Sequence, residues 1–215
     1  MIDEQTEKRR SSFWRELPIL VVVAVLVAVL VRMFVLQTFY IPSQSMEHTL
    51  NVWDRVLVNK LVYDFRDPHR GEIIVFKAPS EWQNGEEGED FIKRIIGTPG
   101  DDVKCCDAQG RLIINGKAID EPFIYRNADG TQDPAADKPF EITVPAGRLW
   151  VMGDHRSASG DSLEHWEETG DITKSTITEN SIVGRAFTVF WPVSRAKWLS
   201  VPKEFDGIPN PPAAK

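Results

Sequence analysis

Two serine hydroxyls, those of Ser43 and Ser45, follow a long apolar segment, within the stretch Phe39 to Leu50. Pro42 fixes one backbone dihedral and biases the residue before it towards an extended conformation. Residues two positions apart on an extended strand point to the same side, so the two hydroxyls can face the same way. This pattern suits a serine nucleophile, but a polar linker after an apolar segment has the same composition.

A second candidate group lies on the stretch Asp90 to Gly97, where alternation puts Lys93 on one strand face and Arg94 on the other, both among apolar residues. Burial lowers the pKa of a lysine, which can then serve as a general base, whereas a buried arginine stays charged and needs a carboxylate. Alternatively, Lys93 would lie on an edge strand with its ammonium in solvent. The combination with Ser45 makes this lysine a candidate base.

The third candidate is a polar loop with two glycines, Met152 to Ser162, which follows a predicted strand and can orient a catalytic group. Asp154 and Asp161 would also suit a calcium loop. However, His155 and Arg156 lie among the would-be ligands and the carboxylates are few, so we expect neither a metal nor another cofactor.

The composition is that of an ordinary globular protein: 215 residues, 42% hydrophobic and 27% charged. This indicates one domain with room for a lobe. The formal net charge is -7, and no basic stripe is visible. A nucleic-acid-binding domain needs such a stripe, so we exclude nucleic acid as a partner.

One segment near the start is far more apolar than the rest. Every residue from Leu17 to Val31 is apolar, and the run resumes after Arg32. About 20 such residues cross a bilayer, so residues 17–37 predict a transmembrane helix. No small-x-small cleavage site follows, which favours a retained anchor over a cleaved signal peptide. Residues 1–16, polar and mixed in charge, predict a short flexible tail.

Basic residues gather before this helix rather than after it, which sets its expected orientation. The positive-inside rule places the N-terminus in the cytoplasm and everything after Tyr40 on the far side of the plasma membrane. The lipid bilayer is therefore an expected partner. The basic residues before the helix are Lys8, Arg9, Arg10 and Arg15, and Arg55 is the one that follows at a comparable distance.

Residues 38–199 carry short β-branched or aromatic runs bounded by turn residues, which is typical of a mostly β domain with antiparallel strands. Asn115-Gly116 predicts a hairpin turn. Pro79–Asp90 and Ala128–Pro139 indicate surface loops, and residues 200–215 a flexible tail. The expected strands are Arg55–Asn59, Glu72–Phe76, Phe91–Ile96, Arg111–Ile114, Glu141–Val144, Leu149–Met152 and Ile182–Trp191.

The two cysteines, Cys105 and Cys106, are adjacent. Adjacency excludes the spacing of a zinc knuckle and leaves a vicinal disulfide, two free thiols or intermolecular pairing. An oxidising compartment favours the disulfide, but the sequence does not choose among the three.

Five ordered segments, from the helix to about Trp191, resemble the conserved boxes of bacterial type I signal peptidases. The stretch Cys105 to Gly110 is similar to actinobacterial members. The resemblance implies a β catalytic domain over residues 38–199, with a less conserved lobe at about 102–148, anchored in the bacterial cell membrane. The five segments are Ile41–Met46 with Thr49–Leu50, Asp54–Lys60, Arg70–Lys77, Phe91–Asp101 and Met152–Ser162.

This resemblance implies a serine endopeptidase that cleaves signal peptides from exported preproteins without a cofactor. Ser45 would be the nucleophile and Lys93 the general base of a Ser-Lys dyad. Ser43 would donate its hydroxyl to the oxyanion together with the backbone N–H of Ser45. Ser159 would hold the Lys93 ammonium in line.

Two acidic residues would support this dyad, again by resemblance. Asp154 would pair with Arg94, and Asp161 would support the loop. The family often has an arginine where this chain has Leu163, so the partner of Asp161 is open. The resemblance also implies shallow pockets for small side chains, lined by Phe39, Ile41, Met46, Leu50, Val56 and Ile92.

Two other functions compete with this one. The first is a Ser-His-Asp hydrolase that uses His48, His155 or His165. The chain has no Gly-x-Ser-x-Gly elbow, and Asp154 adjoins His155, so their side chains diverge on an extended strand. The second is a non-catalytic anchored β domain, which would have no reason to bury a lysine.

Overall fold

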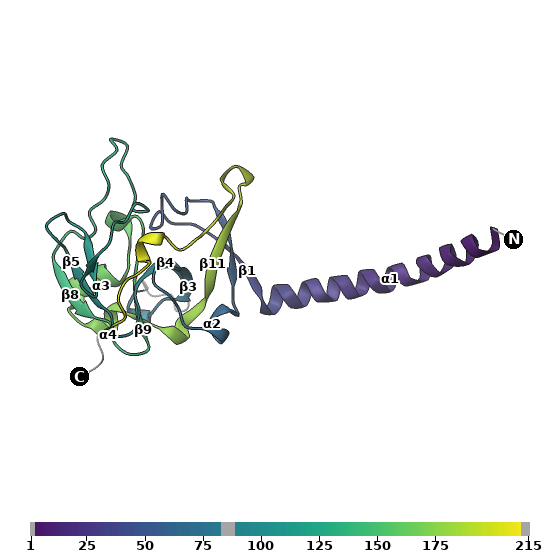
Figure 1. Ribbon diagram of the computed structural model, residues 1–215, viewed down its shortest axis with the longest axis horizontal. Helices are drawn as coiled ribbons and strands as arrows, with labels where there is room; N and C mark the ends of the chain where they lie inside the picture. Colours follow the sequence, from purple (N-terminus) through teal and green to yellow (C-terminus); the bar gives the residue numbers. More distant parts are fainter. Residues whose placement is uncertain (1–2, 83–88, 212–215) are drawn as a thin grey trace. The chain divides into compact units, whose positions relative to one another are not determined.

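The computed structural model describes residues 3–82 and 89–211. The chain divides near Gln37 into an N-terminal unit and a C-terminal domain (Figure 1). Residues 83–88, in the predicted loop Pro79–Asp90, and residues 212–215 lie outside the described residues.

Helix α1, Asp3–Phe34, forms the N-terminal unit. The flexible tail predicted for residues 1–16 is thus helical from Asp3 onward, because this stretch is rich in the helix formers Glu, Lys and Arg and contains no glycine. The part long and apolar enough to cross a membrane is Glu16–Phe34, with a mean hydropathy of 2.8. The predicted span over residues 17–37 ends too late, since Leu36 and Gln37 belong to a strand.

An eight-stranded sheet dominates the C-terminal domain, in the order β1-β2-β11-β3-β4-β9-β10, with β12 paired to β11. The pairs β2–β11, β11–β3, β3–β4 and β4–β9 are antiparallel, as predicted. The bounds are β1 Leu36–Tyr40, β2 Arg55–Asn59, β3 Ile73–Lys77, β4 Asp90–Gly97, β9 Arg148–Met152, β10 Ile177–Thr178, β11 Ile182–Trp191 and β12 Lys197–Trp198.

A second sheet of four strands forms the predicted lobe, in the order β7-β6-β5-β8. Asn115 and Gly116 both have positive φ and join β6 to β7, which confirms the predicted hairpin. The mostly β, antiparallel fold class is thus confirmed. The bounds are β5 Asp102–Cys105, β6 Leu112–Ile114, β7 Lys117–Ala118 and β8 Phe140–Thr143.

Three short helices were not expected: α2 Val62–Phe65, α3 Ser162–Thr169 and α4 Ile172–Ser175. Helix α3 begins at the N-cap Asp161 and ends at Gly170, which is left-handed. The capping aspartate and the glycine stop are ordinary helix signals that a mostly β pattern conceals over so short a length.

The flexible tail predicted for residues 200–215 is wrong for the described part of that segment. Phe205 and Ile208 are buried in the core of the lobe, and the Phe205 ring stacks on the ring of Phe123. Asn115 Nδ2 donates to the Pro209 carbonyl over 2.8 Å. The proline-rich ending predicts fraying, but two apolar anchors offset the entropy of ordering the chain.

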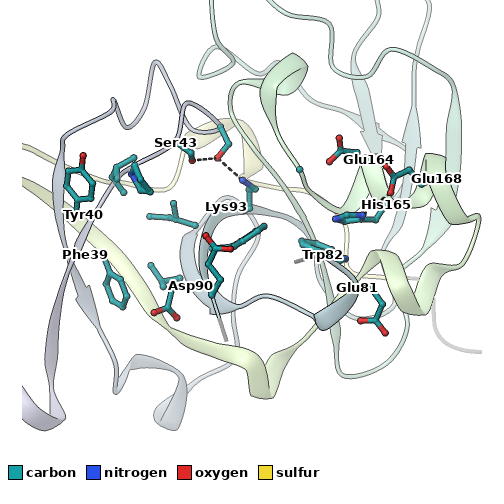
Figure 2. A pocket seen from close by; sticks show the side chains of 18 residues that line it. Phe39, Tyr40, Ser43, Glu81, Trp82, Asp90, Lys93, Glu164, His165 and Glu168 are labelled. Atoms are coloured by element: carbon teal, nitrogen blue, oxygen red, sulfur yellow. Dashed lines mark hydrogen bonds and ion pairs between the residues drawn. The ribbon is translucent and has the colours of Figure 1, made fainter. Parts of the chain in front are cut away.

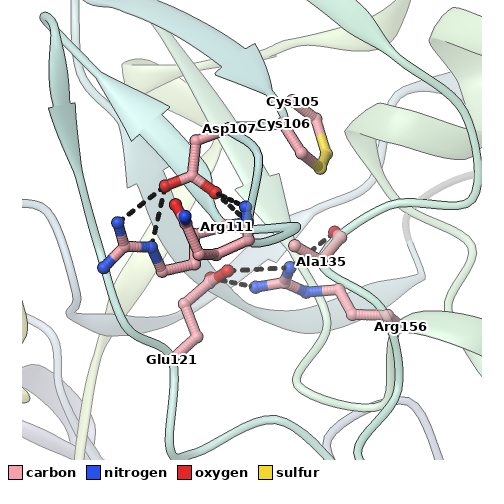
Figure 3. The surroundings of a disulfide bond; sticks show 8 residues. Cys105, Cys106, Asp107, Arg111, Glu121, Ala135 and Arg156 are labelled. Carbon is pink, nitrogen blue, oxygen red and sulfur yellow. Dashed lines mark hydrogen bonds and ion pairs between the residues drawn. A yellow bond between two sulfur atoms is a disulfide. The ribbon is translucent and has the colours of Figure 1, made fainter.

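The structure joins Cys105 and Cys106 in a disulfide at the end of β5 (Figure 3). The vicinal disulfide is one of the three states that the sequence leaves open for these cysteines. Nearby, Asp107 forms an ion pair with Arg111 over 2.7 Å.

Candidate active site

Lys93 and Ser45 meet in the interior of the C-terminal domain. Lys93 lies on β4, which pairs with β3 on one side and β9 on the other, so the edge-strand alternative is wrong. Its Nζ donates a hydrogen bond of 2.7 Å to Ser45 Oγ (Figure 2), and both residues are buried, with 4% and 5% of their surface exposed.

The environment of Lys93 makes its amine easier to deprotonate than that of an ordinary lysine. Burial is the largest effect and lowers the pKa of Lys93 from 10.5 to about 8. The negative charges of Asp161, Glu164 and Asp154 act in the opposite direction and raise this pKa. Lys93 therefore has the property expected of a general base near neutral pH.

The backbone at Ser45 is held by the loop that follows β9. The His155 N–H donates to the Ser45 carbonyl over 3.1 Å, and His155 Nδ1 lies 3.2 Å from the Gln44 carbonyl. A Cβ at Gly153 would overlap the Ser45 carbonyl oxygen and the Ser159 hydroxyl, so this close approach requires glycine. These contacts fix the hydroxyl of Ser45 in front of Lys93.

Ser43 lies beside the pair. Its Oγ is 3.3 Å from Ser45 Oγ, its side chain is exposed, and it lines the same cavity (Figure 2). The two hydroxyls thus face the same space, as their spacing predicts. A group bound next to Ser45 Oγ would also be within reach of Ser43.

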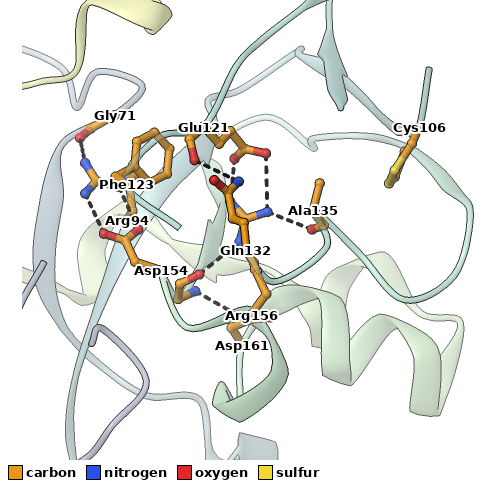
Figure 4. A network of polar contacts seen from close by, with 12 residues as sticks. Gly71, Arg94, Cys106, Glu121, Phe123, Gln132, Ala135, Asp154, Arg156 and Asp161 are labelled. Atoms are coloured by element: carbon orange, nitrogen blue, oxygen red, sulfur yellow. Dashed lines mark hydrogen bonds and ion pairs between the residues drawn. A yellow bond between two sulfur atoms is a disulfide. The ribbon is translucent and has the colours of Figure 1, made fainter. Parts of the chain in front are cut away.

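The carboxylate that Arg94 needs is Asp154, as the resemblance implies. Arg94 Nε and Nη2 donate to the two oxygens of Asp154 over 2.8 and 2.6 Å, with both side chains buried (Figure 4). Arg94 Nη1 donates to the Gly71 carbonyl, and the guanidinium lies 4.2 Å from the centre of the Phe123 ring. This network locks the strand that carries Lys93.

Asp161 has several partners that replace the missing arginine. Its Oδ2 accepts from the Gly153 N–H over 2.8 Å and from Ser159 Oγ over 2.6 Å, and its Oδ1 accepts from the Leu163 N–H. Ser159 therefore donates to Asp161, whereas the hydrogen bond of Lys93 goes to Ser45. Asp154 and Asp161 are both occupied by donors, which leaves neither as a free calcium ligand.

A buried ion pair that was not expected from the sequence ties the lobe to the same loop. Arg156 pairs with Glu121, and both side chains are only 3% exposed (Figure 4). Arg156 also donates to the Gly153 carbonyl over 3.0 Å and to the Ala135 carbonyl over 2.7 Å. Arg156 thereby stabilises the backbone that packs against Ser45.

Ser45 and Lys93 line a cavity of about 460 Å³. Of the six residues expected to line substrate pockets, Phe39, Ile41 and Ile92 line it. Met46, Leu50 and Val56 are fully buried in the same core cluster as Ile41 and do not line the cavity. The full lining is Phe39, Tyr40, Ile41, Pro42, Ser43, Ser45, Val75, Glu81, Trp82, Glu89, Asp90, Phe91, Ile92, Lys93, Gly160, Glu164, His165 and Glu168.

The three histidines of the Ser-His-Asp alternative contact groups other than Ser45 Oγ. His48 Nδ1 lies 3.1 Å from the carbonyls of Phe123 and Ile124, and the His155 ring stacks on Tyr125. His165 lines the cavity, but its Nδ1 is 3.4 Å from Glu168. In the described part of the chain, the hydrogen-bond partners of Ser45 Oγ are Lys93 Nζ and Ser43 Oγ, neither of which belongs to a histidine, and this disfavours the Ser-His-Asp alternative.

The chain is similar to known proteins over most of its length. Residues 14–191 match the family model described as signal peptidase, peptidase S26. A probable signal peptidase I-2 from Synechocystis sp. is 37% identical over 99% of this chain and 91% of the relative. Signal peptidase I from Mycobacterium tuberculosis is 34% identical over 90% of this chain and 77% of the relative.

The match to a solved signal peptidase I from Enterococcus faecalis V583 covers 56% of this chain and 97% of the solved chain, at 26% identity and a TM-score of 0.41. The family model covers well over half of the chain, and the relatives align with nearly all of it. The chain therefore belongs to the signal peptidase family, peptidase S26.

Proposed function

We propose that this protein is a membrane-anchored serine endopeptidase that removes signal peptides from exported preproteins with a Ser-Lys dyad. The observation that carries the proposal is the 2.7 Å hydrogen bond between the buried amine of Lys93 and Ser45 Oγ. Among the residues that the structure describes, no carboxylate forms a hydrogen bond with Lys93. A buried lysine of this kind is costly as a cation, so its retention favours a chemical role. The relatives named signal peptidase I support the substrate class.

In the proposed reaction, neutral Lys93 takes the proton from Ser45 Oγ as this oxygen attacks the carbonyl carbon of the scissile peptide bond. The carbonyl π electrons move to its oxygen. The Lys93 ammonium then gives its proton to the leaving amine as the C–N bond breaks. A water molecule next attacks the ester carbonyl carbon while Lys93 takes its proton. As the bond between this carbon and Ser45 Oγ breaks, the Lys93 ammonium gives the proton to Oγ, which restores the free hydroxyl and releases the acid.

The charge that develops on the substrate oxygen needs donors. The Ser43 hydroxyl, which faces the same cavity, and the backbone N–H of Ser45 are the proposed pair. Preorganised donors of this kind usually supply the largest single contribution to catalysis.

The remaining site residues are proposed as supports for the dyad. Arg94 and Asp154 hold the strand of Lys93, while Asp161 and Ser159 hold the loop that packs on Ser45. Asp161 also attracts the Lys93 ammonium through space. In this proposal, Ser159 acts through Asp161.

The position of the nucleophile suits a substrate delivered by the membrane. Ser45 follows the candidate span Glu16–Phe34 by a short stretch of chain, so the site would lie close to the bilayer surface. We propose a single-pass protein with the N-terminus in the cytoplasm and the catalytic domain outside. The apolar walls at Phe39, Ile41 and Ile92 would accept small side chains before the cut and reject bulky ones by steric overlap.

The test is cleavage of a purified preprotein by the full chain in detergent. Ser45→Ala and Lys93→Ala should each abolish cleavage. Lys138→Ala is the matched control, because Lys138 is exposed and pairs with Glu167 on the surface, and it should cleave like the wild type. Cleavage by a folded Ser45→Ala protein at a rate near that of the wild type would refute the proposed nucleophile.

A further inference from the structure

The proposed mechanism leaves one charged residue of the catalytic cavity without a role. Glu164 lines the same cavity as Ser45 and Lys93, on the side opposite Phe39 and Tyr40 (Figure 2). It lies in the first turn of α3. The part of the chain that the structure describes gives Glu164 no hydrogen bond or ion pair.

The backbone that carries Glu164 is held firmly against the site. Asp161 caps α3 by accepting from the Leu163 N–H, and Ser162 Oγ accepts from the Val151 N–H over 3.0 Å. A Cβ added to Gly160 would lie 3.0 Å from Glu164 Oε2. The carboxylate therefore folds back over Gly160, which itself lines the cavity.

Of the negative charges that act on Lys93, Glu164 has the fewest partners. Asp154 is neutralised by Arg94, and Asp161 accepts three hydrogen bonds. The other ionisable side chains on the cavity wall are Tyr40, Glu81, Glu89, Asp90, His165 and Glu168, and the last two lie 3.4 Å apart.

We infer that Glu164 is a positioning residue for the reaction, because its carboxylate stabilises, across the cavity, the ammonium that Lys93 becomes when it takes the proton of Ser45. This inference rests on the proposed Ser-Lys function. A fixed negative charge near a site where positive charge develops needs no reorganisation during the reaction. A bound peptide would also expel water from the cavity and strengthen the attraction.

The electrostatics act in both directions between these two residues. The Glu164 charge raises the pKa of Lys93 against the larger effect of burial. Glu164 is exposed at the cavity wall, and partial desolvation is the main reason why its pKa is raised. The neighbouring His165 lowers this pKa more than Lys93 does, but Lys93 acts in the same direction. Removal of the Glu164 charge should therefore make Lys93 easier to deprotonate but less able to hold the proton it receives.

The experiment measures kcat/KM of the full chain against pH on a preprotein substrate. In the wild type, kcat/KM should rise with pH as Lys93 loses its proton, and we call this part of the profile the limb. Glu164→Gln should move the limb to lower pH by about half a unit, the size expected for one charge several ångströms away across a partly solvated cavity. The rate on the plateau should also fall, by about threefold or more, since the ammonium loses support. Glu164→Asp, which keeps the charge, should restore the position of the limb.

The matched control is Glu167→Gln, which removes the same charge from the same helix but from a surface pair with Lys138. It should leave the limb in place. An unmoved limb in Glu164→Gln, or an equal shift in both variants, would overturn the inference.

Lys93→Ala separates this inference from the proposed function. If Lys93→Ala is inactive and the limb of Glu164→Gln is unmoved, only the role of Glu164 fails. If folded Lys93→Ala still cleaves, the proposed function fails, and the role of Glu164 fails with it. Near-UV circular dichroism on each variant checks that the fold is retained.

Discussion

The pH dependence of cleavage follows from the burial of Lys93. Only the neutral amine can accept the proton of Ser45, so kcat/KM should rise with pH and reach half of its plateau near the pKa of Lys93, which is about 8. With this pKa, about one tenth of the enzyme is competent at pH 7, compared with about one molecule in 3,000 for an ordinary lysine. Burial thus raises the reactive fraction about 300-fold.

The assay is initial-rate cleavage of a preprotein from about pH 6 to pH 10, with the same profile for Lys93→Arg and Lys93→His. A guanidinium cannot lose its proton in this range, so the arginine variant should be inactive although charge and length are nearly retained. The histidine variant would keep at most a trace of activity, with its limb near pH 6.5.

Two results would refute the reasoning. One is a wild-type profile that is flat between about pH 7 and pH 9, the range in which the neutral fraction should rise about tenfold. The other is cleavage at a comparable rate by an arginine variant whose near-UV circular dichroism matches that of the wild type.

Four further outcomes are expected. Ser43→Ala should lower kcat about 10²-fold with little change in KM, and an unchanged kcat would remove this hydroxyl from the oxyanion site. Asp154→Asn leaves the buried Arg94 cation without its carboxylate, so the free energy of unfolding should fall by about 3–5 kcal/mol in urea denaturation; a loss below about 1 kcal/mol would contradict the pairing. His155→Ala should cleave within about tenfold of the wild type, since it loses ring contacts such as that with the Gln44 carbonyl but keeps the backbone N–H that holds the Ser45 carbonyl; inactivity in a folded variant would favour a triad. Phe205→Ala should lower the free energy of unfolding by about 3 kcal/mol, whereas a neutral effect would support the flexible tail.

Local alternation was enough to predict that β4 carries a buried lysine and a buried arginine that needs a carboxylate, but not which residues contact them. The pattern of β4 puts Lys93 and Arg94 on opposite faces, and the structure agrees: one contacts Ser45 and the other Asp154. The pairing of Arg94 with Met152 across β4 and β9 brings Asp154 into reach. This register depends on which strands become neighbours, and a single sequence without the family resemblance does not reveal it.

The incorrect predictions of pocket-lining residues and of a flexible C-terminal tail have a common physical origin. An apolar side chain can face either a cavity or the core, and the sequence alone does not distinguish the two. Ile92 lines the cavity, whereas Val56 is fully buried in the core, although both are apolar strand residues in the segments that resemble the family. Phe205 shows the same ambiguity near the C-terminus. There, a few apolar residues among prolines anchor a segment whose composition predicts flexibility. Burial is a property of the assembled layers, so local sequence does not determine it.

The site balances two opposing requirements on one amine. Deeper burial would lower the pKa of Lys93 further and increase the neutral fraction, but it would also penalise the ammonium that must form when Ser45 gives up its proton. The negative charges of Asp161, Glu164 and Asp154 oppose the effect of burial on the pKa of Lys93, and the resulting pKa of about 8 is close to neutral pH. A general base is most effective near this point, because proton uptake and proton release are then both accessible. Since acylation needs Lys93 first as a base and then as an acid, the carboxylates around the cavity are as much a part of the proposed mechanism as the burial itself.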